Sequence, residues 1–447
     1  MLRGRAGASR RHRGVSLARA VSKITLVNVV IFVGGFLTGP IVARALGPSG
    51  RGQLAAIIAP LAFIPIVLGL GLGAFAAREV AAGRTLRVVL GALLPVSIAL
   101  GLAGAAGGWF VADVLSDGNS TIRTFLRLGF LLAPVSLVVV GLQSVLAGQQ
   151  RWNRLLLARA IPTVLAIVAV PTLYALGALT VATAAIVTIV GGVASAIPAL
   201  KLLRGGRSFE WDRRYAAQAV SFGARAWAGG VANMANLRLD QVVMITLTTD
   251  SQLGLYAVAV TIASAPTVLP AAVAGPLQAR VAAGDRGIVA RTTRTTIALV
   301  VLVHVVAGAL AVPVVKLLFG PGFSGSIVMV WILLAAGVPF AAKMLLSTVL
   351  SADGVPGRTA VAEFLALGLT VGLLLALVPE HGGMGAAVTS AVAYTASFAV
   401  LARAAVKRNL APGFRDLLIP QGEDVRWMLA TARGWLRRLR HRRSEPA

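Results

Sequence analysis

The sequence predicts an all-α polytopic membrane protein with about twelve transmembrane helices, arranged as two six-helix bundles related by a parallel internal repeat. Three observations lead to this fold class: the length of the apolar blocks, the placement of the basic residues and a self-similarity within the chain. The 447 residues are 57% hydrophobic and only 13% charged, with a mean hydropathy of +0.85. A soluble domain carries roughly a quarter charged residues.

The apolar residues come in long blocks, many of about 18 residues or more, which is enough to cross ~30 Å of hydrocarbon as a helix. Inside a bilayer each block must satisfy its own backbone hydrogen bonds, and a helix does so. Short links between the blocks imply antiparallel neighbours. The expected spans are residues 22–45, 54–76, 87–110, 124–147, 157–177, 180–203, 217–247, 253–277, 293–318, 326–350, 358–378 and 383–405.

Basic residues are concentrated in alternate loops and in both tails. With the N-terminus in the cytoplasm, the cytoplasmic tails and loops hold 34 of the 42 Lys and Arg residues, and four more lie within spans. The opposite side holds only Arg44, Arg51, Arg123 and Arg127. This excess predicts a multi-pass protein of the cell membrane with both termini in the cytoplasm and an even number of spans.

The chain also resembles itself at a period of roughly 202 residues. Three pairs of segments match at corresponding helix ends: 77–84 with 279–286, 144–146 with 348–350, and 52–55 with 254–257. Because the period holds six helices, the two halves share one orientation, and their symmetry axis runs along the membrane normal. Parallel repeats of this kind are typical of transporters, whose substrate path lies at the repeat interface.

These signals divide the chain into five parts. They are a basic cytoplasmic N-tail (1–21), an N-terminal six-helix bundle (22–203), a cytoplasmic linker (204–216), a C-terminal six-helix bundle (217–405) and a basic cytoplasmic C-tail (406–447). Residues 423–443 of the C-tail have an apolar face and many arginines, and they are expected to form an amphipathic helix on anionic membrane lipids.

Several function classes are excluded by what the sequence lacks. With no cysteine, disulfides, thiolate metal sites and thiol catalysis are ruled out. There is no P-loop, no metal-ligand cluster and no large outer loop with paired catalytic carboxylates, so we expect neither an enzyme nor a cofactor. The net charge of +27 lies mainly in tails and loops, which is a membrane-orientation pattern rather than a nucleic-acid signal.

Polar residues within spans are costly in lipid and usually face a bundle interior or a wet cavity. The seventh span is the richest, with Arg225, Asn233, Asn236, Arg238 and Asp240. One interpretation is that these residues line a central cavity whose guanidinium groups meet an anionic substrate. The alternative is structural: Asp240 ties two helices together and Arg225 reaches the cytoplasmic interface.

Four other residues are candidates. Lys343 and Glu363 lie near the cytoplasmic ends of adjacent spans, where they are expected to form a salt bridge or to take part in coupling. His304 is either a hydrogen-bonded packing residue or a proton-coupling group. Arg44 ends the first span, where it either attracts phosphate at the outer mouth or binds lipid headgroups.

Four segments resemble the polysaccharide flippase family of O-antigen or teichoic-acid type, a MATE-like branch of the multidrug/oligosaccharidyl-lipid/polysaccharide (MOP) exporter superfamily. Residues 41–52 are similar to the exit of the family's first helix, and residues 221–227, 237–241 and 254–259 are similar to its seventh and eighth helices. The resemblance implies a V-shaped pair of six-helix bundles with a cationic central cavity.

The resemblance also implies a bacterial flippase that moves undecaprenyl-pyrophosphate-linked oligosaccharide from the inner to the outer leaflet by alternating access. Its role would be cell-surface polysaccharide biosynthesis, such as that of O-antigen and lipopolysaccharide, alongside the glycosyltransferases and polymerase of the same pathway. Arg225 and Arg238 would contact the pyrophosphate or the sugar. Two alternatives stay open: an ion-coupled multidrug exporter of MATE type, and a membrane glycosyltransferase or polysaccharide polymerase.

Overall fold

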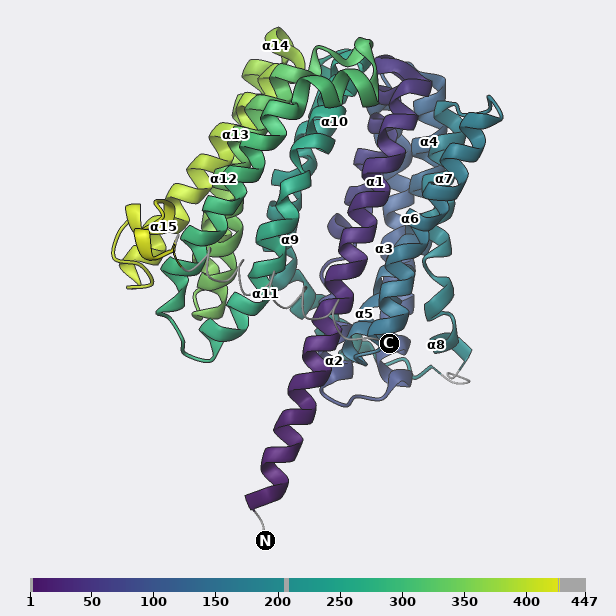
Figure 1. The fold of residues 1–447 in the computed structure, drawn as a ribbon. Helices are drawn as coiled ribbons and strands as arrows, with labels where there is room; N and C mark the ends of the chain where they lie inside the picture. The colour runs from purple at the N-terminus through teal and green to yellow at the C-terminus, as the bar shows by residue number, and fades with distance from the viewer. Residues whose placement is uncertain (1–2, 205–208, 425, 427–447) are drawn as a thin grey trace, which may run out of the picture. The chain divides into compact units, whose positions relative to one another are not determined.

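The computed structural model describes residues 3–204, 209–424 and 426, and every regular element in this part of the chain is helical (Figure 1). The α-helices are α1 (Arg3–Val67), α2 (Leu72–Ala81), α3 (Leu86–Leu115), α4 (Ser120–Leu131), α5 (Ala133–Gly148), α6 (Trp152–Ala175), α7 (Val181–Ala194), α8 (Lys201–Arg204), α9 (Arg213–Leu247), α10 (Asp250–Ala263), α11 (Val268–Ala282), α12 (Ile288–Val314), α13 (Ser326–Ala352), α14 (Pro356–Lys407) and α15 (Arg415–Leu418). Short turns are η1 (Ile197–Ala199), η2 (Ala265–Thr267), the π-helical η3 (Val315–Phe319) and η4 (Pro321–Phe323). The predicted all-α fold class is confirmed.

Several helices begin at a side chain that caps free backbone amides. The Asn119 carboxamide oxygen accepts hydrogen bonds from two amides at the start of α4. Thr180 and Thr183 form a reciprocal capping box at the start of α7. The Asp212 carboxylate accepts from the amides of Arg214 and Tyr215, so α9 begins slightly before the predicted seventh span. Such caps satisfy donors that have no partner inside the helix.

Breaks within the helical segments fall where the sequence has glycine or proline. Within α1, Gly47 has a φ of 65°, and within α14, Gly382 has a φ of 53°, a left-handed conformation that glycine adopts without steric cost. The axes of α4 and α5 differ by 51°, with Pro134 in the first turn of α5. The breaks at Gly47 and Gly382 separate segments that the hydropathy pattern predicts as distinct spans, whereas the bend between α4 and α5 lies inside the single predicted span 124–147.

Eight of the described helical segments are long and apolar enough to cross a bilayer, or nine if α4 and α5 form one bent span. The 52 residues of α14 would measure about 78 Å at 1.5 Å per residue, more than twice the hydrocarbon thickness. Two crossings separated at Gly382 fit this length better than one. The exact number of twelve spans stays a prediction.

The chain divides into two compact units. Unit 1 comprises residues 1–262, 313–329 and 371–386, and unit 2 comprises residues 263–312, 330–370 and 387–447. Within unit 1, α1 packs against α6 and α7, and α3 packs against α4 and α5 (Figure 1). Helix α9 contacts α1, α2 and α3. Unit 1 therefore includes residues 217–262, 313–329 and 371–386 of the predicted C-terminal bundle, and the division into two six-helix bundles stays a prediction.

Unit 2 is built around α11, α12, α13 and α14, with one apolar core. Leu345, Leu346 and Val349 of α13 are fully buried in this core, next to Leu401 of α14. Leu417, in the short helix after α14, belongs to the same core and is also fully buried. The first part of the C-tail is therefore packed onto the bundle.

Candidate functional site

Helix α9 carries the polar residues expected to form a cavity, and their side chains differ in exposure. Asn236 and Asp240, one turn apart, are buried, whereas Arg238 is exposed. This difference follows from helix geometry, because residues two apart point in different directions. Arg225 and Asn233 also lie on α9, but their side chains are outside the described part of the structure.

The Asp240 carboxylate connects two consecutive helices. Its Oδ2 accepts a hydrogen bond from the hydroxyl of Tyr256 in α10, and its Oδ1 accepts from the amide of Gln241 at 2.7 Å. Tyr256 is fully buried. These bonds agree with the interpretation of Asp240 as a tie between helices, because a buried carboxylate is stable only when its lone pairs are satisfied.

Arg238 lies in a local excess of positive charge. It interacts electrostatically with Arg51 and with Asp240, all within unit 1. Arg51 follows the break at Gly47 and is partly buried. Arg238 therefore interacts with one carboxylate and with a second guanidinium group. In the sequence, Arg51 is distinguished only as an outer-side charge within the family-like segment 41–52.

The Arg44 guanidinium group donates hydrogen bonds to the C-terminal end of η3. Its Nε donates to the carbonyl of Leu318 at 2.8 Å, and its Nη2 donates to the carbonyl of Leu317. Both carbonyls belong to η3, which ends at Phe319. Terminal helix carbonyls have no partner within the helix and carry partial negative charge, so Arg44 caps this turn within unit 1.

In unit 2, Lys343 and Glu363 form the expected ion pair. The Lys343 ammonium lies 3.0 Å from each Glu363 carboxylate oxygen, and both side chains are 3% exposed. The rings of Phe340 and Tyr394 have centroids 5.7 Å and 5.5 Å from the ammonium. The pair is bidentate and enclosed by apolar and aromatic groups.

His304 is buried in unit 2, with its Nδ1 2.6 Å from the carbonyl oxygen of Val300. Since a carbonyl only accepts, Nδ1 carries the proton in this contact. The ring packs so closely against Gly337 that a side chain there would collide with Nε2. This geometry agrees with the interpretation of His304 as a hydrogen-bonded packing residue.

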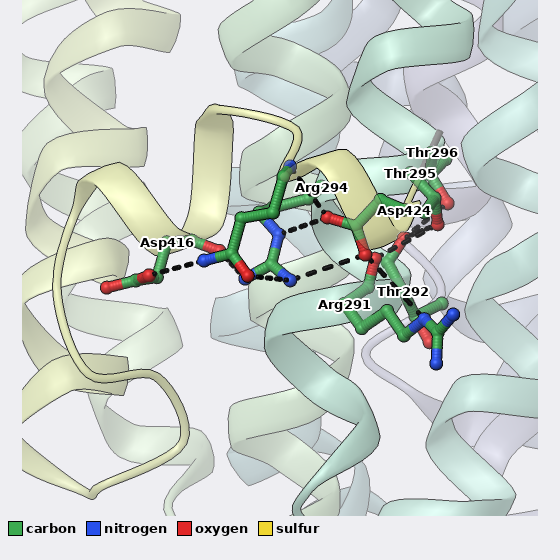
Figure 2. Close-up of polar contacts among 8 residues, drawn as sticks. Arg291, Thr292, Arg294, Thr295, Thr296, Asp416 and Asp424 are labelled. Carbon is green, nitrogen blue, oxygen red and sulfur yellow. Dashed lines mark hydrogen bonds and ion pairs between the residues drawn. The ribbon is translucent and has the colours of Figure 1, made fainter. Parts of the chain in front are cut away.

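Figure 2 shows a polar cluster that sequence analysis did not identify. Arg294 of α12 donates from Nε to Asp424 Oδ2 at 2.8 Å, from Nη1 to the Asp416 carbonyl at 3.0 Å and from Nη2 to Gln421 Oε1 at 3.4 Å. Arg291 lies 3.6 Å from the same carboxylate. The hydrogen bond from Arg294 is the main cause of a pKa of Asp424 below its usual value. In the sequence, no helical periodicity connects Arg294 of α12 with Asp424, which lies 130 positions further along the chain.

This cluster fixes the segment after α14 to unit 2. The side chains of Arg294 and Asp424 are 9% and 1% exposed, and Leu410 and Leu417 are buried in the same core. The predicted amphipathic helix over residues 423–443 lies outside the described residues, apart from 423, 424 and 426. The described cluster is therefore the attachment from which the basic tail continues.

A cavity of about 270 Å³ lies in unit 1 where the second predicted span is interrupted. Its lining includes Ser97, Ser144 and Trp227 among apolar and glycine residues. The indole N–H of Trp227 donates to the carbonyls of Ile66 and Val67 at 2.9 Å and 2.8 Å. Trp227 thereby satisfies carbonyls that the interruption frees, a role not apparent in the sequence.

Metal ligands are not grouped in the described part of the chain. Within residues 3–204, 209–424 and 426, no cluster of three or more His, Asp and Glu side chains is placed to hold a metal ion. The polar side chains on and next to α9 include the buried carboxylate of Asp240, the carboxamide of Asn236 and the exposed guanidinium of Arg238.

A family model described as polysaccharide biosynthesis protein matches residues 17–277, more than half of the 447 residues. No curated protein matches the sequence. Solved structures, by contrast, match most of the chain at low identity.

Three of these structures illustrate the fold. The lipid II flippase MurJ, in an inward closed conformation, is 14% identical with a TM-score of 0.70, over 85% of this chain and 87% of that chain. An inward-facing multidrug resistance MATE family transporter of the MOP superfamily is 19% identical with a TM-score of 0.64, over 86% and 94%. A MOP superfamily transporter from Pyrococcus furiosus, described as having a binding pocket of reverse polarity, is 17% identical with a TM-score of 0.55, over 87% and 95%. The chain has the fold of this superfamily.

Proposed function

The chain belongs to the polysaccharide biosynthesis protein family and has the fold of the MOP exporter superfamily, and from this premise we propose that it is a flippase. Its substrate would be an undecaprenyl-pyrophosphate-linked oligosaccharide, moved from the inner to the outer leaflet by alternating access. The product would enter cell-surface polysaccharide assembly, together with the glycosyltransferases and polymerase of the pathway. The chain itself performs no catalysis in this proposal.

The observation that carries the proposal is the pair of cations Arg51 and Arg238 in unit 1. Their mutual interaction is repulsive, and the Asp240 carboxylate, which interacts with Arg238, already accepts two hydrogen bonds. An entering pyrophosphate would relieve this repulsion and accept planar, bidentate hydrogen bonds from guanidinium groups. Asn236, one turn before Asp240 on α9, would add an uncharged polar group to the same helix.

The proposed orientation follows the positive-inside distribution of lysine and arginine. Both termini lie in the cytoplasm of a cell-membrane protein, and the basic tail after Asp424 binds anionic lipids. In this orientation Arg51 is at the outer end of the second span. The cation pair then attracts the headgroup toward the outer leaflet, while the polyprenyl chain stays in the bilayer.

The test is translocation in proteoliposomes that contain a fluorescent polyprenyl-pyrophosphate glycan. We expect wild-type protein to move it, and the variant with Arg51→Gln and Arg238→Gln to lose about tenfold or more in rate, because each charged hydrogen bond contributes ~1.5–3 kcal/mol. Arg225→Gln with Arg238→Gln tests the sequence-based pair. Arg127→Gln, whose arginine pairs with Asp113, is the matched control. Wild-type rates in both double variants would disprove the site.

The second candidate function is ion-coupled export of cationic drugs. The buried acid Asp240 and the likeness to MATE transporter folds favour it. Under this alternative, cells expressing the protein would expel cationic dyes in an ion-dependent way, and Asp240→Asn would abolish the efflux. The flippase proposal predicts no dye efflux from the same cells.

A further inference from the structure

Two turns of unit 1, residues 48–52 and 250–254, are in direct backbone contact. Gly52 lies so close to the carbonyl oxygen of Asp250 that a methyl group on Gly52 would overlap it. Gly254 lies equally close to the carbonyl oxygen of Pro48. Neither contact can form with any residue larger than glycine at positions 52 and 254 unless the backbones move apart.

The two contacts are reciprocal under the internal repeat. Gly254 follows Gly52 by 202 positions, and Asp250 follows Pro48 by the same 202. Each half of the chain therefore contributes one glycine and one carbonyl to the contact. A two-fold axis relating the halves must pass between these turns, so they lie directly at the repeat interface.

Side-chain hydrogen bonds also connect the two turns and their neighbours. Gln53 Nε2 donates to Asp250 Oδ2 at 3.0 Å, and Ser326 Oγ donates to the carbonyl of Leu255 at 2.8 Å. The Gly383 amide donates to Gln252 Oε1 at 3.3 Å. These bonds join the two turns and their neighbours through neutral and singly charged groups.

We propose that this reciprocal glycine contact, formed by residues 48–52 and 250–254, is the outer gate of the transporter. The proposal rests on the transport function above, because a substrate path at the repeat interface must be closed by a contact across that interface. The charge distribution assigns this end of the chain to the outside. Outward release requires Gly52 to separate from Asp250 and Gly254 to separate from Pro48.

The natural absence of cysteine permits a direct cross-linking test. Gln53→Cys with Asp250→Cys joins the two sides of the gate. Asp113→Cys with Arg123→Cys, which replaces an ion pair of 3.3 Å within the N-terminal half, is the control. The oxidised gate pair should stop glycan translocation, and reductant should restore it, while the control pair keeps its rate. Translocation through a fully cross-linked gate would overturn the proposal.

A second test needs no substrate. Gly52→Ala or Gly254→Ala should force the turns apart and raise labelling of a Gln53→Cys reporter by external maleimide about tenfold, since overpacking of this kind shifts an equilibrium strongly. Gly35→Ala, where a methyl group meets open space, should leave the labelling unchanged. Unchanged labelling in both gate variants would overturn the gate. If the wild-type protein moves no lipid-linked glycan but the labelling rises, the proposed substrate is wrong and the gate stands.

Discussion

Asp424 is almost completely buried beside Arg294, so its charge state decides whether the segment after α14 stays attached to unit 2. Asp424→Asn should weaken this attachment by about 2 kcal/mol, because it leaves a buried guanidinium with a poorer partner. Hydrogen exchange of residues 415–424 measures the loss. Glu423→Gln, at the exposed neighbouring position, is the control, and equal exchange in both variants would contradict the role of Asp424.

The same carboxylate gives the attachment a pH dependence. Its folded pKa is lowered by the Arg294 hydrogen bond, so the attached state favours the ionised form. The contribution is fully present above the unfolded value of about 3.9 and is lost as the pH falls through the lowered folded value. Exchange in residues 415–424 should therefore stay slow from neutral pH down to about 4 and rise below it.

The Lys343–Glu363 pair illustrates a buried ion pair whose partners cannot be removed singly. Glu363→Gln should destabilise unit 2 by about 3–5 kcal/mol, because it leaves the buried Lys343 ammonium without an oppositely charged partner. Lys343→Met with Glu363→Leu should cost far less, since it removes both charges. Thermal unfolding in detergent distinguishes the cases, and a double variant as unstable as the single one would refute this account.

Residues differ in how far their contacts are predictable. Lys343 and Glu363 lie in adjacent spans at the same depth, so the sequence contains enough information to pair them. Arg294 and Asp424 are 130 positions apart, and Asp424 lies at the start of the predicted amphipathic helix of the C-tail, whose periodicity does not identify a partner in another helix. Arg51 was missed because a guanidinium near a loop has the same sequence signal whether it faces water or another cation.

At the scale of whole elements, the helices were predictable and their interruptions only partly so. Apolar length predicted the long helical segments, but the break at residues 68–71 depends on tertiary contacts. Gly71 and Gly223 of α9 touch through their backbones, and Trp227 satisfies the carbonyls that the break frees. A glycine in an apolar helix is common, so its partner cannot be read from the local sequence.

This packing makes a prediction for α9. Gly223→Ala places a methyl group against the carbonyl of Leu70, and overpacking should cost about 1–3 kcal/mol. Gly275→Ala in α11, where a methyl group meets open space, should be neutral or slightly stabilising because alanine favours helix. Melting temperatures of the two variants in detergent test this, and equal values would show that the backbones separate without cost.

At the scale of the whole molecule, the topology has a test that uses the two ends of α3. Thr85 and Ser120 flank this helix and are both exposed, and the positive-inside distribution assigns Thr85 to the cytoplasm and Ser120 to the outside. In intact cells, a membrane-impermeant maleimide should label Ser120→Cys and leave Thr85→Cys unlabelled until the cells are opened. Ser444→Cys in the C-tail should behave like Thr85→Cys, because an even number of spans returns the chain to the cytoplasm. External labelling at Ser444→Cys alone would make the number of spans odd, and external labelling at Thr85→Cys would invert the orientation that the gate and the cation pair both require.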